Sequence, residues 1–178
     1  MRRFVAAIAA LISAAVVVAV VNYALVHHDM RMAIESDDRN SGLVFYAYHE
    51  NFVVPGTIVI DLRGVSVTNS QADVFRLLLQ FAAKQKDKTY QRVILAFRGD
   101  PRFILKGEYF KKLGQEYETQ NPVYTMRTFS ENVLNVDGMP AFGAWTGGFV
   151  GVLGKQMEDF TELHHRWYIR SLAHSGAK

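Results

Sequence analysis

Residues 57–97 decide the fold of this chain; they read TIVIDLRGVSVTNSQADVFRLLLQFAAKQKDKTYQRVILAF. Residues 57–62 and 92–97 are short, almost entirely apolar runs, a pattern typical of strands that are buried on both faces. Between them, residues 72–83 carry apolar side chains around much of a helical circumference, which predicts a helix packed against a sheet. Strand, helix and strand in this order predict a βαβ unit with a right-handed crossover.

The same alternation continues on both sides of this unit. Residues 43–49 and 123–129 are rich in β-branched and aromatic residues and are predicted as strands, the first of them at an antiparallel edge. Residues 105–117 are predicted as a second helix and residues 155–173 as a final amphipathic helix. We therefore expect an α/β fold: an N-terminal transmembrane helix, then one small, mostly parallel βαβ-type sheet domain that ends in an amphipathic helix.

The N-terminus carries a membrane-spanning signal. Residues 4–21, FVAAIAALISAAVVVAVV, contain no charge, and about 20 helical residues cross the ~30 Å hydrocarbon layer of a bilayer. Arg2 and Arg3 precede the run, so the N-terminus should be cytoplasmic and the C-terminal domain extracytoplasmic, or periplasmic in a bacterium. We divide the chain into a signal-anchor helix (1–26), a juxtamembrane linker (27–42) and a soluble α/β domain (43–178).

A cleaved signal peptide is the alternative to an anchor. Cleavage requires small residues at the −3 and −1 positions shortly after the apolar run. The run is followed by NYALVHHD, and cleavage after Ala24 would place Asn22 at −3. The poor fit favours an uncleaved anchor.

Charge and composition exclude several classes of protein. The chain has 20 basic and 17 acidic residues, so the part after Arg2 and Arg3 has 18 against 17 and is nearly neutral. A nucleic-acid binder needs a dense basic face, and we expect no nucleic-acid partner. The chain contains no cysteine, which excludes disulfides, thiolate metal sites and a cysteine nucleophile.

Arginine and aspartate residues recur where the predicted strands end. Ligands of parallel α/β sheets collect at the carboxyl ends of the strands, and guanidinium groups bind carboxylate or phosphate through paired hydrogen bonds. These residues therefore predict either a pocket for a small anion or a set of mutual ion pairs. The candidates are Asp61, Arg63, Arg98, Asp100 and Arg127.

Residues 143–154, GAWTGGFVGVLG, form a glycine-rich apolar segment before Lys155. The spacing does not match a Walker A motif, which needs glycine where Phe149 stands and Ser or Thr where Gln156 stands. The segment could pack inside the domain, touch the membrane or bind a partner. The candidate partner-binding residues are Trp145, Phe149, Val152 and Leu153.

Metal and catalytic motifs are incomplete. Glu162 and His165 form one Glu-x-x-His pair, whereas a di-iron bundle uses two such pairs with two more glutamates. His27, His28 and Asp29 are more typical of a solvated flank than of a metal site. The sequence has no G-x-S-x-G nucleophile motif. We expect no metal and no cofactor, and the catalytic residues, if any, are unknown.

These features favour a non-enzymatic function. The anchor, the incomplete catalytic motifs and the aromatic, glycine-rich last third predict an accessory or binding subunit of a membrane-associated assembly, with a protein partner. The alternative is an enzyme or receptor for a small anionic ligand that uses the arginines at the strand ends.

Overall fold

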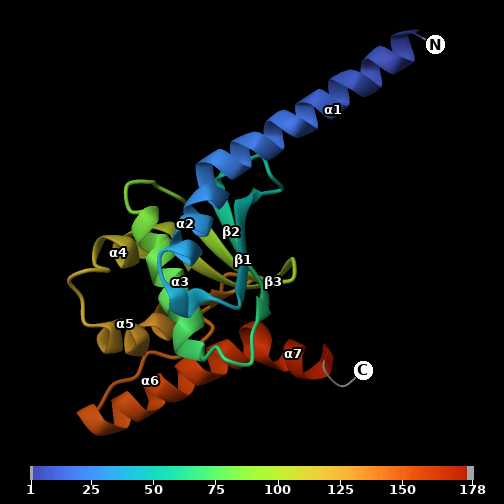
Figure 1. Cartoon of the computed structure of the whole chain (residues 1–178). Coiled ribbons are helices and arrows are strands. Elements are labelled where there is room, and N and C mark those ends of the chain that lie inside the picture. Colours follow the sequence, from blue (N-terminus) through green and yellow to red (C-terminus); the bar gives the residue numbers. More distant parts are fainter. Residues whose placement is uncertain (1, 176–178) are drawn as a thin grey trace.

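The computed structural model describes residues 2–175, apart from the side chains of Phe149 and Ser175. They form an α/β fold in which helices pack on a mixed sheet and one long apolar helix leaves the domain (Figure 1). The strands follow one another across the sheet in chain order. They are β1 (Leu43–Glu50), β2 (Val54–Val65), β3 (Arg92–Phe97), β4 (Asp100–Lys106) and β5 (Val133–Asn135).

The expectation of a mostly parallel sheet is wrong. Strands β2 and β3 are parallel, as the βαβ pattern predicts, and β1 pairs with β2 as the predicted antiparallel edge strand, but β3 with β4 and β4 with β5 are antiparallel as well. The cause is the tight turn after β3, where Arg98 and Gly99 adopt φ values of 52° and 85°. So short a turn forces β4 to run back beside β3, because a parallel neighbour needs a long crossover connection.

Two predicted elements are also corrected. Residues 105 and 106 of the predicted 105–117 helix belong to the end of β4, and the helix itself is α4 (Gly107–Gln115). The predicted strand 123–129 is helix α5 (Pro122–Phe129). Its β-branched and aromatic residues suit a strand locally, but the Asn121 side chain accepts a hydrogen bond from the Val123 N–H, and proline occupies the first turn. Both are helix-starting features.

Helix α3 (Gln71–Lys84) forms the centre of the helical layer. It begins with a capping box, in which Ser70 and Asp73 exchange hydrogen bonds between side chain and backbone. The apolar face of α3 packs on inward-facing side chains of β2, among them Ile58, Ile60 and Leu62. Helix α4 lies close beside α3, since a Cβ on Gly114 would lie 2.2 Å from the Ala82 carbonyl oxygen.

The segment 27–42, which the sequence predicts as a linker, contributes to the core. Helix α1 (Arg2–Asn22) continues through a π-helical turn, η1 (Tyr23–His27), into helix α2 (His28–Glu35). A short 3₁₀ turn, η2 (Asp38–Asn40), follows. Met30 and Ala33 of this segment, and Val26 just before it, are fully buried in the main core cluster. The buried part of the fold therefore begins before residue 43.

The C-terminal helix begins earlier than predicted. Helix α6 (Phe149–His164) is followed by a π-helical turn, η4 (His165–Ile169), and by α7 (Arg170–Ser175), while the 3₁₀ turn η3 (Ser130–Asn132) precedes β5. Phe160, His164 and Trp167 are buried on one face, as their spacing predicts. The Trp167 indole N–H donates to the Ala96 carbonyl oxygen at 3.0 Å, which ties this helix to β3.

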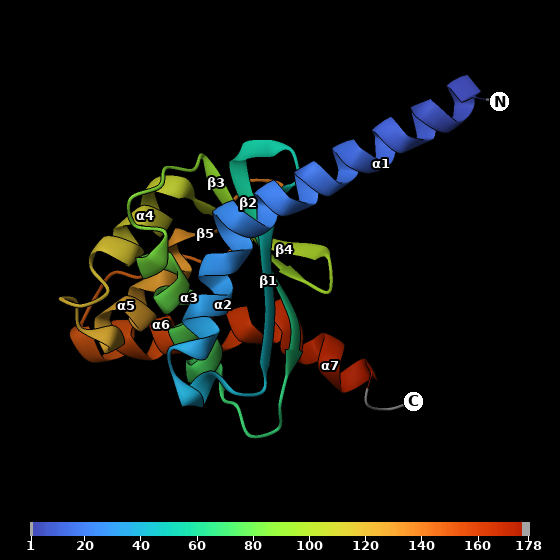
Figure 2. The same cartoon turned by 45° about the horizontal axis from the view of Figure 1, so that its top comes forward.

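The two faces of the sheet differ. Helices α2 to α5 lie together on one side, and α1 leaves the domain toward the other side (Figure 2). On that second side, Val59, Ile94 and Ala96 form a small cluster with Tyr48 and Ile104. We call this second side the open face, because no helix among the described residues covers its centre in either view.

Candidate functional site

Asp61 is the centre of the polar cluster on the open face. Its carboxylate is fully buried, and it accepts hydrogen bonds from the Gly99 N–H (2.9 Å) and the Tyr48 hydroxyl (3.3 Å). The Arg63 guanidinium pairs with it at 2.6 Å. Burial raises the pKa of the Tyr48 hydroxyl, and the negative charge of Asp61 raises it further. The buried charge is thus compensated within the chain, and it fixes the β3–β4 turn.

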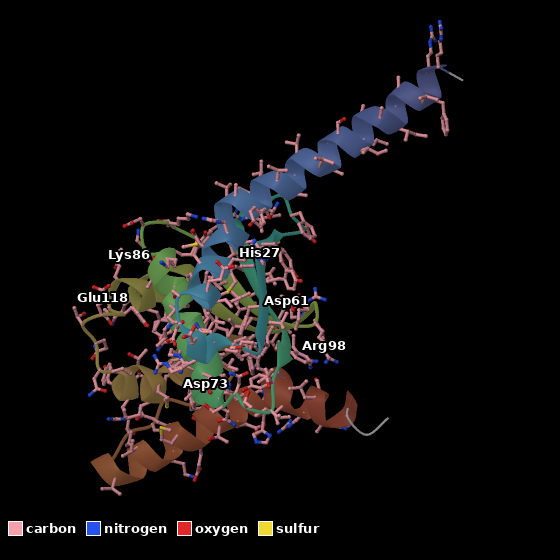
Figure 3. The ribbon with its side chains drawn as sticks, in the orientation of Figure 1. His27, Asp61, Asp73, Lys86, Arg98 and Glu118 are labelled. Atoms are coloured by element: carbon pink, nitrogen blue, oxygen red, sulfur yellow. The ribbon has the colours of Figure 1, made fainter. Side chains whose placement is uncertain are left out.

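Arg98 lies beside Arg63 at the edge of this cluster. Its Nε–H donates to the Arg63 carbonyl oxygen at 3.3 Å, and its guanidinium lies 5.1 Å from the centre of the Phe97 ring. Asp100 follows in the same turn but pairs with Arg102 at 3.1 Å. Figure 3 shows Asp61 and Arg98 on the same side of the domain. Four of the five predicted ligand-binding residues therefore gather at this end of the sheet.

Arg127 does not join them. It belongs to α5, and its Nε–H donates to Gln156 of α6 at 2.9 Å. Helix α5 and the labelled Arg98 lie on opposite sides of the sheet (Figures 1 and 3). The prediction that Arg127 joins this cluster requires a strand at residues 123–129, and these residues form a helix instead.

The cluster resembles a set of mutual ion pairs more than an anion pocket. The carboxylate of Asp61 already pairs with the Arg63 guanidinium, so an external anion would share that positive charge with a fully buried partner. Removing one partner from a buried pair is costly, because the other charge is left uncompensated. A small anionic ligand at Arg63 and Arg98 stays a prediction.

The predicted partner-binding segment has a definite structure around Trp145. The Trp145 indole N–H donates to the Asp159 carboxylate at 2.6 Å, and the Lys155 ammonium lies 5.8 Å from the indole ring. These contacts hold the loop against the middle of α6. Val152 and Leu153 are half-buried, and the side chain of Phe149 lies outside the described part of the chain.

Among the described side chains in the first half of α6, the most exposed apolar one was not among the predicted residues. Val150 is 81% exposed. It stands between glycines at positions 148, 151 and 154, where an added Cβ would meet no atom within 4 Å. In α4, by contrast, the chain's own packing requires Gly107 and Gly114, with Cβ positions 1.8 and 2.2 Å from backbone oxygens. Packing within the chain does not account for the glycines of α6.

A groove of about 480 Å³ between α3, α4 and α5 was not predicted, because α5 was assigned as a strand. Its apolar wall includes Phe75, Leu79 and Met126. Two arginines also line it, but Arg39 pairs with Asp37 and Arg76 with Asp73, each at 2.7 Å. The hydrogen bond from Arg39 holds the pKa of the Asp37 carboxyl well below its usual value. The groove thus offers no uncompensated positive charge.

His164 is a titratable residue that lies in the core. It is fully buried, and both ring nitrogens lack a hydrogen-bond partner among the described residues. Its ring lies 4.6 Å from that of Phe160 and 5.6 Å from that of Tyr168. Burial lowers the pKa of His164 to about 3. Within residues 2–175, no three His, Asp or Glu side chains gather as a metal site would require.

No family model matches the chain, and no curated protein and no solved structure shows significant similarity to it. Geometry, burial and charge are therefore the grounds on which we propose a function.

Proposed function

We propose that the chain is a single-pass membrane protein whose helix α1 crosses the bilayer. The continuous helix from Arg2 to Glu35 contains an 18-residue window with a mean hydropathy of 2.9, and none of that window is buried. Leu11, in the middle of α1, is 71% exposed. An apolar helix of this length is long enough to span the hydrocarbon layer, where its side chains escape water. Arg2 and Arg3 favour a cytoplasmic N-terminus and an extracytoplasmic domain, which is periplasmic in a bacterium.

The domain is joined to this helix without a flexible segment. Asp29 of α2 accepts hydrogen bonds from Gln85 (2.6 Å) and Lys88 (3.2 Å), which follow the end of α3. Asn40, just after α2, donates to the Ala33 carbonyl oxygen at 3.0 Å and to Gln80 at 2.6 Å. These contacts support a domain held in one orientation relative to α1. A fixed orientation suits a protein that presents a surface at a set height above a membrane.

That surface, in our proposal, is the first half of α6, and the chain is an accessory or binding subunit of a membrane-associated assembly. The single observation that carries the proposal is the exposed Val150 among glycines that no contact within the chain requires. Glycine in a helix interior costs about 1 kcal/mol relative to alanine. Close packing of another helix against the backbone can offset that cost, because small residues allow the two helices to approach. The partner is therefore expected to bring an apolar helix of its own.

The arrangement of the whole molecule agrees with this role. The first half of α6 projects from the domain on the side away from α1 (Figure 1). A partner bound there would not compete with the bilayer for the same surface. Asp159 and Lys155, which bracket Trp145, provide a polar rim around the apolar patch.

The size of the particle in mild detergent tests the proposal. The full-length protein, extracted from its native membrane, should run in a particle larger than one or two copies plus detergent. Val150→Asp should reduce that particle to the chain alone, because a charge at the centre of an apolar contact is costly to desolvate.

Val67→Asp is the matched control, since Val67 is fully exposed in the loop between β2 and α3. It should leave the particle intact. A native particle no larger than two copies would contradict the binding-subunit proposal, as would loss of the partner from both variants equally.

A further inference from the structure

We infer that the β1–β2 hairpin is a second membrane contact, with its tip, Phe52–Val53–Val54, inserted in the interface of the same bilayer that α1 crosses. The inference deepens the proposed membrane anchoring and depends on it. The partner is a lipid surface, and the observations concern the position of the tip, its composition and the way it is held.

The tip is joined directly to the end of the apolar helix. Asn22, the last residue of α1, is nearly fully buried, and its amide donates to the Phe52 carbonyl oxygen at 2.5 Å. Its side-chain oxygen accepts a hydrogen bond from the His49 N–H at 2.8 Å. Asn22 directly follows the apolar run, so a bilayer that contains residues 4–21 ends close to it. The hairpin tip is therefore at the level of the interface.

The composition of the tip fits that level. Phe52 is 53% exposed and Val53 is 64% exposed, so neither side chain is enclosed by the domain. The Phe52 ring instead stacks on Tyr48, with centroids 5.1 Å apart and planes at 14°. Tyr23, at the same level on η1, is also exposed. Aromatic residues concentrate where a membrane protein leaves the hydrocarbon layer.

The backbone holds the tip in an unfavourable conformation. Asn51 and Phe52 adopt φ values of 51° and 64°, a region that costs a residue with a side chain about 1–2 kcal/mol. Such a conformation persists when surrounding contacts determine it, and here the Asn22 side chain and the Phe52 N–H bond to the His49 carbonyl oxygen at 2.7 Å do so. The turn formed in this way places an aromatic side chain at the exposed tip.

The direction of α1 brings this part of the molecule toward the bilayer. In both views α1 leaves the domain over the open face, away from α3 and α4, and the β1–β2 hairpin lies beside its end (Figures 1 and 2). A bilayer crossed by α1 thus meets the hairpin before it meets the helical layer. Two contacts, rather than one, then fix the tilt of the domain.

The absence of cysteine makes the inference directly testable, because single cysteines can be introduced and spin-labelled in the full-length chain. We would prepare Leu11→Cys, Val53→Cys and Val67→Cys and reconstitute each in phosphatidylcholine–phosphatidylglycerol vesicles. Collision of the label with oxygen, which concentrates in lipid, is compared with collision with a water-soluble nickel chelate. Val53 and Val67 are matched valines on exposed loops at opposite ends of β2.

The expected result is an oxygen-to-nickel collision ratio at Val53 several-fold above that at Val67 and closer to the ratio at Leu11. A lipid-like ratio at Leu11 with equal, water-like ratios at Val53 and Val67 would overturn the inference and leave the anchor standing. A water-like ratio at Leu11 itself would overturn the anchor, and the inference with it. Val54→Cys, on the same hairpin, repeats the measurement if Val53→Cys fails to fold.

Discussion

His164 shows how a single residue can set the response of the domain to pH. Its imidazole is surrounded by aromatic rings and has no hydrogen-bond partner among the described residues. Burial, and to a lesser extent the charge of His165, lower its pKa to about 3 from an ordinary value of 6.5. In the unfolded chain the ring binds a proton near pH 6.5. Between this pH and about pH 3, the unfolded state therefore binds a proton that the folded state does not. Stability is therefore lost as the pH falls below about 6.5.

We expect His164→Leu to remove this pH dependence. Between pH 7 and pH 5, protonation of this residue in the unfolded state should lower the free energy of unfolding of the parent by about 2 kcal/mol. The loss accumulates from the unfolded pKa of about 6.5 down to pH 5, at about 1.36 kcal/mol for each pH unit. At pH 7 the variant should be as stable as the parent or more so, since two unsatisfied polar atoms disappear. Urea unfolding at both pH values, followed by circular dichroism in one detergent, measures the difference.

His174→Leu is the control, because His174 is exposed in α7. The free energy of unfolding of this variant should change with pH as that of the parent does. A parent and a His164→Leu variant with equal pH dependence would show that the ring gains no proton on unfolding in this range.

At the scale of single residues, the sequence predicted the buried face of the last helix better than the polar cluster around Asp61. The helical spacing of Phe160, His164 and Trp167, four residues and then three, showed which face of the last helix is buried, because helical periodicity is local. The placement of Arg127 failed for the opposite reason. To place Arg127, one must know the secondary structure of residues 123–129 and which other element they pack against. Neither can be derived from the local sequence pattern.

Among the elements, α4 and α6 allow one substitution to be compared in two surroundings. Gly114→Ala in α4 places a Cβ 2.2 Å from the Ala82 carbonyl oxygen. The helices must move apart, and we expect a loss of about 1–3 kcal/mol in stability. Gly151→Ala in α6 meets no atom within 4 Å, so the higher helix propensity of alanine should raise stability by about 1 kcal/mol.

Urea unfolding of the two variants in the same detergent measures both effects. If Gly151→Ala destabilised the chain as much as Gly114→Ala does, α6 would already be packed within the chain, and its glycines would need no partner. In the native membrane the same Gly151→Ala change should weaken the large particle, since it enlarges the surface that the partner helix approaches.

The elements that the sequence predicted well are those with strong local signals. The βαβ unit of β2, α3 and β3 was confirmed in order and direction. The antiparallel β4 was missed because residues 100–106 combine charges, a proline and a short apolar stretch. Its pairing with β3 is created by the turn at Arg98 and Gly99, whose positive φ values leave little trace in the sequence.

For the whole molecule, the continuity from α1 to α2 matters most. A flexible linker at residues 27–42 would have let the domain tumble, whereas the buried Val26, Met30 and Ala33 make the end of the anchor part of the core. The π-helical turn at Tyr23–His27 lies at the junction, where Asn22 and His27 contact the backbone N–H groups of His49 and Ala47 on β1. These contacts protect the outer edge of β1, which is otherwise available for pairing with another strand.

The most direct test of this account is whether native membranes retain the full-length chain during a wash in alkaline carbonate. We predict that the chain stays with the membrane pellet through this wash and is released by detergent, because a spanning helix is held by the hydrocarbon layer and not by surface charge. Release of the intact chain into the carbonate supernatant would contradict the anchor, and with it the proposed orientation of the domain and the second membrane contact at the β1–β2 hairpin.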